Sequence, residues 1–188
     1  MIRFESRTEM LHEIPQGGEC CEVGVFAGDF SRQIAAICDP ARLVLVDLFQ
    51  AWTFSGDEHG GNGRTLSGDF MLDASKALAA TRQGVEVYSG PSSQVLPTLS
   101  DHSLDFIYLD ADHSYEGVKN DLAQAWRLVR YGGFIAGHDY SINAEKCVDA
   151  SHYANFGVKR AVDEFLDEHD LMIYGMAMDG YTSFIIKK

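Results

Sequence analysis

Short apolar runs alternate with amphipathic stretches along most of the chain. Five runs have the length and composition of buried strands: Cys20–Val23, Leu43–Val46, Val85–Tyr88, Phe106–Leu109 and Phe134–Ala136. The stretches between them carry apolar residues at helical spacing: Phe30–Ile37, Phe70–Thr81, Ser92–Leu96 and Val118–Val129. Gly132 and Gly133 are expected to end the last of these helices. Helical crossovers of this kind join parallel strands.

The C-terminal part of the chain departs from this alternation. A helical stretch, Gly157–His169, precedes two apolar runs, Leu171–Met176 and Thr182–Ile186, and a tight Asp179–Gly180 turn joins these runs. A tight turn joins antiparallel strands, so one terminal strand must run against the others. The sequence therefore predicts an α/β fold, in which a doubly wound seven-stranded sheet is mostly parallel with a C-terminal antiparallel hairpin.

Composition narrows the class of protein. The 188 residues suit one domain, 1–188, and 46% of them are hydrophobic, which is enough for a core. The net charge of −13 argues against nucleic acid or an anionic membrane as a partner, because both attract basic surfaces. No apolar run is long enough to span a membrane, the N-terminus lacks an apolar signal segment, and the four cysteines form no C-x-x-C pair. We therefore expect a cytoplasmic protein with free thiols.

The first strand leads into a glycine-containing turn and then a helix, an arrangement that presents backbone N–H groups to a ligand. A dinucleotide-binding turn would have the spacing G-x-G-x-x-G, so that the backbone approaches a pyrophosphate. Counting from Gly24, the second glycine position holds Phe26 and the third holds Asp29. A bulky ring and a carboxylate both oppose a pyrophosphate at this turn.

The turn suits a different cofactor. Its pattern is acid-x-Gly-x-x-x-Gly, with Glu22, Gly24 and Gly28, and Asp47 ends the following strand. An acid at that strand end is placed to accept hydrogen bonds from ribose hydroxyls. A cationic sulfonium, an amino acid tail and a single ribose fit such a turn, so the sequence predicts S-adenosyl-L-methionine as the cofactor, with Phe26 beside it.

A second polar group follows the third predicted strand. Gly90, Ser92 and Ser93 would lie near an adenine by their position in the fold. The alternative is that Ser92 only caps the helix that begins there.

Acid and imidazole side chains follow two neighbouring predicted strands. Asp110 ends one strand, and His138 and Asp139 end the strand reached by the next crossover. The carboxyl ends of parallel strands meet at one edge of the sheet, so these side chains should converge. Two adjacent carboxylates repel unless a positive charge lies between them. The sequence predicts a divalent cation, Mg²⁺ or Mn²⁺, at Asp110, His138 and Asp139, with a protonated His138 as the alternative.

Two further residues directly follow Asp110. Asp112 or His113 is placed to act as a general base toward a hydroxyl group. Against this role, Asp112 is also suited to cap the next helix, and His113 to lie on the surface.

Several motifs together resemble those of a known family: CEVGVFAGDFS, LVLVDLF, LDFIYLDADHSYEGVKNDL, GGFIAGHDY, GVKRAVDEFL and SFIIKK. The chain resembles class I S-adenosylmethionine-dependent methyltransferases. It is most similar to small-molecule O-methyltransferases of the macrocin, mycinamicin and cephalosporin-cluster type, and more distantly to catechol O-methyltransferases. The resemblance spans most of the chain outside residues 50–69 and the first few residues.

The resemblance implies a Rossmann-like seven-stranded sheet with a terminal hairpin. It also implies that Glu22, Gly24, Gly28 and Asp47 bind the cofactor, with Asp110 beside it as the first metal ligand. The relatives have two acids, or Asp and Asn, where this chain has His138 and Asp139, so His138 is a departure from the family pattern.

The expected function is methyl transfer from S-adenosylmethionine to a hydroxyl of a small molecule, with assistance from a divalent cation. A nicotinamide-dependent oxidoreductase and a non-catalytic S-adenosylmethionine-binding protein are the alternatives. The acceptor pocket would come from residues 50–69 and 141–155. Trp52, Phe54, His59 and Arg64 are candidates for a lid over the acceptor, although a solvated loop explains them equally. The sequence does not identify the methyl acceptor, and it does not decide whether the protein forms a homo-oligomer.

Overall fold

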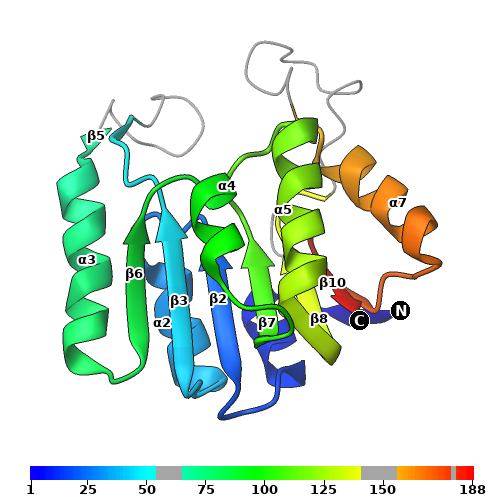
Figure 1. Ribbon diagram of the computed structural model, residues 1–188, viewed down its shortest axis with the longest axis horizontal. Coiled ribbons are helices and arrows are strands. Elements are labelled where there is room, and N and C mark those ends of the chain that lie inside the picture. Colours follow the sequence, from blue (N-terminus) through cyan, green and yellow to red (C-terminus); the bar gives the residue numbers. More distant parts are fainter. Residues whose placement is uncertain (54–64, 141–155, 179–180) are drawn as a thin grey trace.

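The computed structural model describes residues 1–53, 65–140, 156–178 and 181–188, and it contains one central sheet with helices on both faces (Figure 1). The eight strands lie in the order β1-β9-β10-β8-β7-β2-β3-β6. Their bounds are β1 Ile2–Phe4, β2 Glu19–Val23, β3 Arg42–Asp47, β6 Val85–Ser89, β7 Leu104–Leu109, β8 Val129–Gly137, β9 Gly175–Ala177 and β10 Ser183–Lys187. A separate antiparallel pair is formed by β4 Trp52–Thr53 and β5 Thr65–Leu66.

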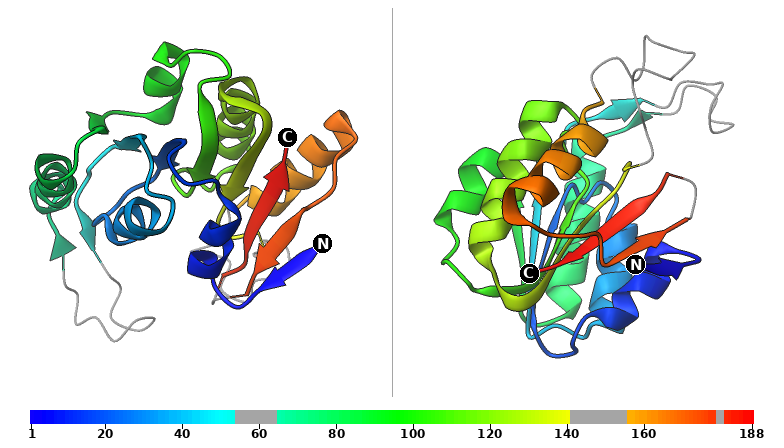
Figure 2. Two further views of the ribbon diagram at one scale, coloured as in Figure 1. Left: turned by 90° about the horizontal axis from the view of Figure 1, so that it is seen from below. Right: turned by 90° about the vertical axis from the view of Figure 1, so that its right-hand side faces the viewer.

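Two hydrophobic layers cover the sheet, because alternate side chains of each strand face opposite sides. In β3, Val44 and Val46 pack in one layer, whereas Leu43 and Leu45 pack in the other. The helices of the first layer are α4 Ser92–Val95, η2 Leu96–Thr98, α5 Tyr115–Leu128 and α7 Val158–His169. Those of the second are α1 Arg7–Met10, η1 Leu11–Glu13, α2 Asp29–Ile37 and α3 Gly68–Thr81. Figure 2 shows the sheet between them. None of the described helices is both long and apolar enough to cross a membrane.

The predicted α/β architecture and its antiparallel C-terminal hairpin are confirmed. β10 pairs antiparallel with both β8 and β9, while β7, β2, β3 and β6 run parallel. The strand count differs from the predicted seven, because β1 pairs parallel with β9 and adds an eighth strand. The strand predicted at Leu171–Met176 starts only at Gly175, and the predicted Asp179–Gly180 turn lies outside the described residues.

One boundary prediction is wrong. Gly132 and Gly133 were expected to end a helix, but α5 ends at Leu128 and both glycines lie within β8. The pairing of β7 with β8 shifts register between Leu104 and Phe106, which is an irregularity of the bulge type. Gly132 has φ +84°, a backbone conformation that favours glycine. These glycines therefore serve strand geometry, as glycines at bulges commonly do.

The direction of the parallel strands determines which edge of the sheet carries the candidate site. β2, β3, β6 and β7 end at the same edge of the sheet, and the loops that follow them meet there. β8 runs parallel to β7, so it delivers its last residues to that edge as well.

Candidate functional site

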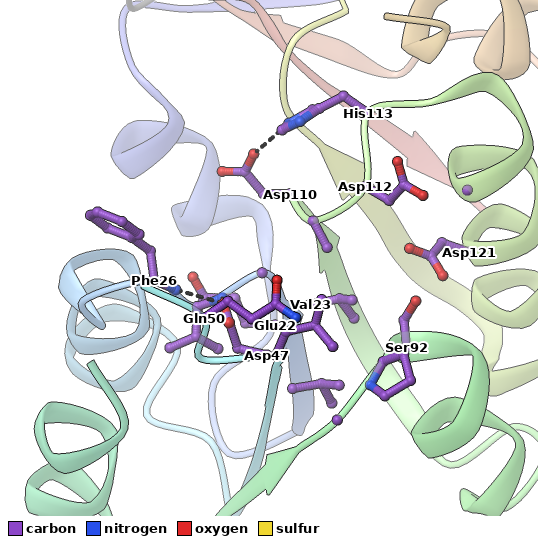
Figure 3. Close-up of a pocket in the computed structure, with 18 of the residues that line it drawn as sticks. Glu22, Val23, Phe26, Asp47, Gln50, Ser92, Asp110, Asp112, His113 and Asp121 are labelled. Atoms are coloured by element: carbon purple, nitrogen blue, oxygen red, sulfur yellow. Dashed lines mark hydrogen bonds and ion pairs between the residues drawn. The ribbon is translucent and has the colours of Figure 1, made fainter. Parts of the chain in front are cut away.

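A pocket of about 870 Å³ opens at the carboxyl ends of the parallel strands (Figure 3). Its walls come from the turns after β2, β3, β6 and β7 and from the start of α5. Most of the predicted cofactor and catalytic residues line it, namely Glu22, Gly24, Phe26, Asp47, Gly90, Ser92, Ser93, Asp110, Asp112 and His113. Gly28, His138 and Asp139 lie outside this lining.

The glycine turn after β2 forms the floor of the pocket. Gly24 has φ +90°, and a side chain there would lie less than 3 Å from the backbone carbonyl of Asp110. Gly24 thus lets the β2 turn approach the β7 turn closely. Gly28, at φ +75°, directly precedes α2 and aligns that helix with the turn. Phe26 adopts φ +52° and its side chain is partly exposed.

Asp47 holds this turn in place. Its Oδ2 accepts hydrogen bonds from the backbone N–H groups of Val25 at 2.7 Å and Phe26 at 2.9 Å. Its Oδ1 accepts a third from Phe49 N–H at 2.6 Å. A carboxylate offers about four acceptor positions, so Asp47 supports the turn with most of its capacity and still faces the pocket.

Glu22 is a buried carboxyl at the centre of the site, only 2% exposed. Burial raises its pKa to about 8, although a hydrogen bond donated by the Ser31 hydroxyl acts in the opposite direction. A cationic group bound beside Glu22 would favour the ionised carboxylate, so this position suits a positively charged part of a ligand.

Asp121 was missed by sequence reasoning. It lies on α5, is 4% exposed, and points into the pocket near Ser92 (Figure 3). Burial raises its pKa to about 6, and a hydrogen bond with Ser92 opposes that rise. The signal was present in the sequence, because Asp121 is an acid within the apolar stripe of Val118 and Leu122.

A cluster of acids and imidazoles borders the pocket. Nε2 of His113 lies 2.8 Å from Oδ2 of Asp139 and 3.4 Å from Oδ1 of Asp110. Nδ1 of His138 lies 3.2 Å from Oδ1 of Asp139 and 3.7 Å from Oδ1 of Asp110. Ligand atoms of Asp110, His113 and Asp139 fall within 4.8 Å of one another, so these three residues have the spacing of a metal site.

Charges in this cluster compensate one another. Burial disfavours charge on His113, but hydrogen bonds with Asp110 and Asp139 outweigh it and raise its pKa to about 9. Burial likewise disfavours charge on Asp139, yet hydrogen bonds from His113 and His138 hold its pKa well below its usual range. Asp139 is also held at φ +62°, an uncommon conformation for a residue other than glycine. The convergence predicted for Asp110, His138 and Asp139 is therefore present, with His113 as a fourth member.

Asp112 has a local structural role beside its place in the pocket. Its Oδ1 accepts a hydrogen bond from the backbone N–H of Ser114 at 2.8 Å. Ser114 in turn caps α5 by accepting a hydrogen bond from the backbone N–H of Gly117 at 3.1 Å. Asp112 therefore sets the turn from which α5 starts.

The proposed lid is described only in part. Trp52 lines the pocket and its side chain is largely exposed. Phe54, His59 and Arg64, together with residues 141–155, lie outside the described residues.

The chain is similar in sequence to a known protein family. A model of the family described as "Methyltransferase domain" matches residues 21–140. No curated protein sequence matches the chain.

Three solved structures illustrate the likeness. A putative caffeoyl-CoA O-methyltransferase from Staphylococcus aureus has a TM-score of 0.64 at 15% identity, with 95% of this chain and 78% of that chain covered. The O-methyltransferase NovP has a TM-score of 0.62 at 19% identity, with 97% and 79% covered. A putative rRNA-methylase from Clostridium thermocellum has a TM-score of 0.64 at 13% identity, with 96% and 92% covered. At these identities the similarity shows a shared fold.

Proposed function

The chain belongs to the methyltransferase domain family, and from this premise we propose that it transfers the methyl group of S-adenosylmethionine to a hydroxyl of a small molecule. The proposal rests on two groups of residues that lie together at one edge of the pocket. There a cofactor-type turn (Glu22, Gly24, Asp47) adjoins the carboxylates of Asp110 and Asp139. The first set suits a sulfonium cofactor, and the second suits the activation of an acceptor oxygen.

The charge of the pocket supports this cofactor. Seven carboxyl side chains line it: Glu22, Asp29, Asp47, Asp110, Asp112, Glu116 and Asp121. Such a lining favours a ligand with positive charges and opposes the pyrophosphate of a nicotinamide dinucleotide. Ser92 and Asp121, on the far side of the pocket from Phe26 in Figure 3, offer polar contacts to an adenine, and Gly90 lines the same pocket.

The donor set fits a divalent cation. Carboxylates of Asp110 and Asp139 with one imidazole are ligands that Mn²⁺ and related ions accept. His113 and His138 are alternatives for the third ligand, because each contacts both carboxylates. When bound, the cation would lower the pKa of an acceptor hydroxyl and fix its position.

The hydrogen bonds with Asp110 and Asp139 that raise the pKa of His113 to about 9 would be weakened by a cation bound to these carboxylates, which favours the neutral imidazole that a base requires. With His138 as the third ligand of the cation, we therefore assign removal of the hydroxyl proton to His113. It lines the pocket, whereas His138 does not, and Asp139 orients its ring through the 2.8 Å contact. Asp112 is the other candidate base, but its carboxylate is engaged by the Ser114 N–H. The ring of His113 stacks on Phe156 with centroids 4.7 Å apart, which further fixes its orientation. An in-line displacement requires this kind of fixed geometry.

A small acceptor is favoured over RNA because the protein carries a net charge of −13 and the pocket itself is acidic. The negatively charged phosphate backbone of RNA would be repelled at this edge of the sheet.

The test begins with binding. Calorimetry should show that the protein binds S-adenosylmethionine and does not bind NAD. Asp47→Ala should weaken cofactor binding by roughly 10-fold or more, because it removes charge-assisted bonds worth about 1.5–3 kcal/mol. The exposed Glu168→Gln variant serves as the control.

Turnover is then measured as S-adenosylhomocysteine release with a panel of sugar and catechol hydroxyl acceptors in the presence of Mn²⁺ or Mg²⁺. His113→Gln should abolish transfer while cofactor binding persists. Binding of NAD in preference to S-adenosylmethionine would contradict the proposal.

A further inference from the structure

The positive charges of the pocket are as informative as its negative ones. Among the described residues that line it, Arg7 is the only Arg or Lys, against seven carboxyl side chains. The amino acid tail of S-adenosylmethionine carries one carboxylate beside its ammonium and sulfonium groups. We propose that Arg7 binds this carboxylate, an inference that rests on the proposed cofactor.

The structure holds the Arg7 guanidinium at the pocket wall. Its carbon lies 4.6 Å above the centre of the Phe30 ring, a cation–π arrangement. Phe30 in turn packs against Tyr108, with ring centroids 4.4 Å apart. Phe30 and Tyr108 are both buried. The buried aromatic pair thus supports the guanidinium at the wall of the pocket.

Arg7 reaches this position from the N-terminal segment. It is the first residue of α1, and Ser6 caps that helix by accepting a hydrogen bond from Glu9 N–H at 3.1 Å. β1, immediately before α1, is tied to the sheet by its pairing with β9. An N-terminal segment that lies outside every predicted site motif therefore brings Arg7 to the same pocket as Glu22 and Gly24.

The neighbours of Arg7 are the carboxylates that would face the cations of the same tail. Nη1 of Arg7 lies 3.3 Å from Oδ2 of Asp110, and the positive charge of Arg7 lowers the pKa of Glu22 against the effect of burial. A ligand that carries an ammonium and a carboxylate would place the first beside Glu22 and Asp110 and the second beside Arg7. Each ligand charge would then meet an opposite charge in a largely buried site.

A structural role for Arg7 makes a different prediction. If Arg7 only neutralises Asp110 and packs on Phe30, its loss should affect every ligand of the pocket alike. If it binds the tail carboxylate, its loss should affect only ligands that have that group. Decarboxylated S-adenosylmethionine, which retains the sulfonium, ribose, adenine and amine, separates the two roles.

The experiment measures dissociation constants of S-adenosylmethionine and its decarboxylated analogue by calorimetry for wild type, Arg7→Ala, Arg7→Lys and the surface control Arg160→Ala. Arg7→Ala should weaken S-adenosylmethionine binding by about 10- to 100-fold. Binding of the decarboxylated analogue should change by less than about 3-fold. Arg7→Lys should restore part of the loss, and Arg160→Ala should resemble wild type.

The ratio of the two constants is the deciding quantity, because a partly unfolded variant lowers both affinities equally. An unchanged ratio in Arg7→Ala, with wild type binding S-adenosylmethionine, would overturn the role of Arg7 and leave the proposed function standing. Failure of wild type to bind either ligand would overturn both.

Discussion

At the scale of single residues, Gly24 has a backbone conformation that favours glycine and lies in the lining of the pocket. Gly24→Ala introduces a side chain less than 3 Å from the Asp110 carbonyl at φ +90°. Gly17 has φ +77° with nothing within 4 Å, so Gly17→Ala tests the backbone strain alone. We expect Gly17→Ala to cost about 1 kcal/mol and Gly24→Ala to cost several times more in denaturant unfolding. Equal losses would show that the close approach to the β7 turn contributes nothing.

Glu22 gives the second residue-scale prediction. Its pKa is about 8 in the fold and 4.5 as the reference value, so the folded protein keeps a proton that the unfolded chain loses above pH 4.5. Stability should therefore fall between pH 4.5 and 8 by an amount on the order of a few kcal/mol from this group.

Glu22→Gln keeps an acceptor for the Ser31 hydroxyl and removes the ionisation, so the variant should gain stability over wild type as pH rises through that window. Denaturant unfolding at pH 5 and pH 8 provides the measurement, and the exposed Glu168→Gln is the control. Parallel pH profiles for wild type and Glu22→Gln would refute the buried, protonated carboxyl.

At the scale of elements, the sequence predicts strands with a regular hydrophobic pattern, but it does not predict irregular strand geometry. All five predicted runs form strands. Strands inside the sheet are buried on both faces and therefore have continuous apolar residues, as in Leu43–Val46. Gly132 was misread because a glycine at φ +84° within a strand and a glycine after a helix look identical in sequence. β1 escaped prediction because a three-residue strand is defined by its partner β9 rather than by its own pattern.

β1 supplies the element-scale prediction. Phe4 is 5% exposed and joins the second hydrophobic layer, whereas Ile2 of the same strand is 39% exposed. Phe4→Ala should destabilise the fold by about 3 kcal/mol, and Ile2→Ala by well under 1 kcal/mol. Denaturant midpoints of the two variants test this difference. Similar effects would mean that β1 is held by its backbone bonds and not by the burial of Phe4.

At the scale of the whole molecule, the sequence reveals those site residues that follow strands and misses those brought in by topology. Glu22 and Asp47 lie within the last two residues of their strands and Asp110 directly follows one, so the parallel sheet alone predicts their meeting. Arg7 and Asp121 lie on helices, and only the packing of α1 and α5 against the sheet brings them to the pocket. Helical residues of this kind need a three-dimensional argument.

The net charge of the molecule frames the last prediction, on the cation. A protein of charge −13 attracts any cation, so stimulation of activity by Mn²⁺ alone would not establish a site. The specific site requires Asp110 and Asp139, whose carboxylates share the contacts of His113 and His138. Chelation at constant ionic strength should abolish methyl transfer and leave S-adenosylmethionine binding intact, and Mn²⁺ or Mg²⁺ should restore transfer.

Asp139→Asn is the informative variant, because Asp139 lies outside the pocket lining and belongs to the proposed cation set. It should lose the response to Mn²⁺, while the exposed Glu168→Gln, which lies outside the pocket lining, should keep it. Full activity after exhaustive chelation would instead assign the charge balance of the two carboxylates to the protonated histidines. In that case the positive charge of the imidazoles, rather than that of a cation, would remove the repulsion between the two carboxylates.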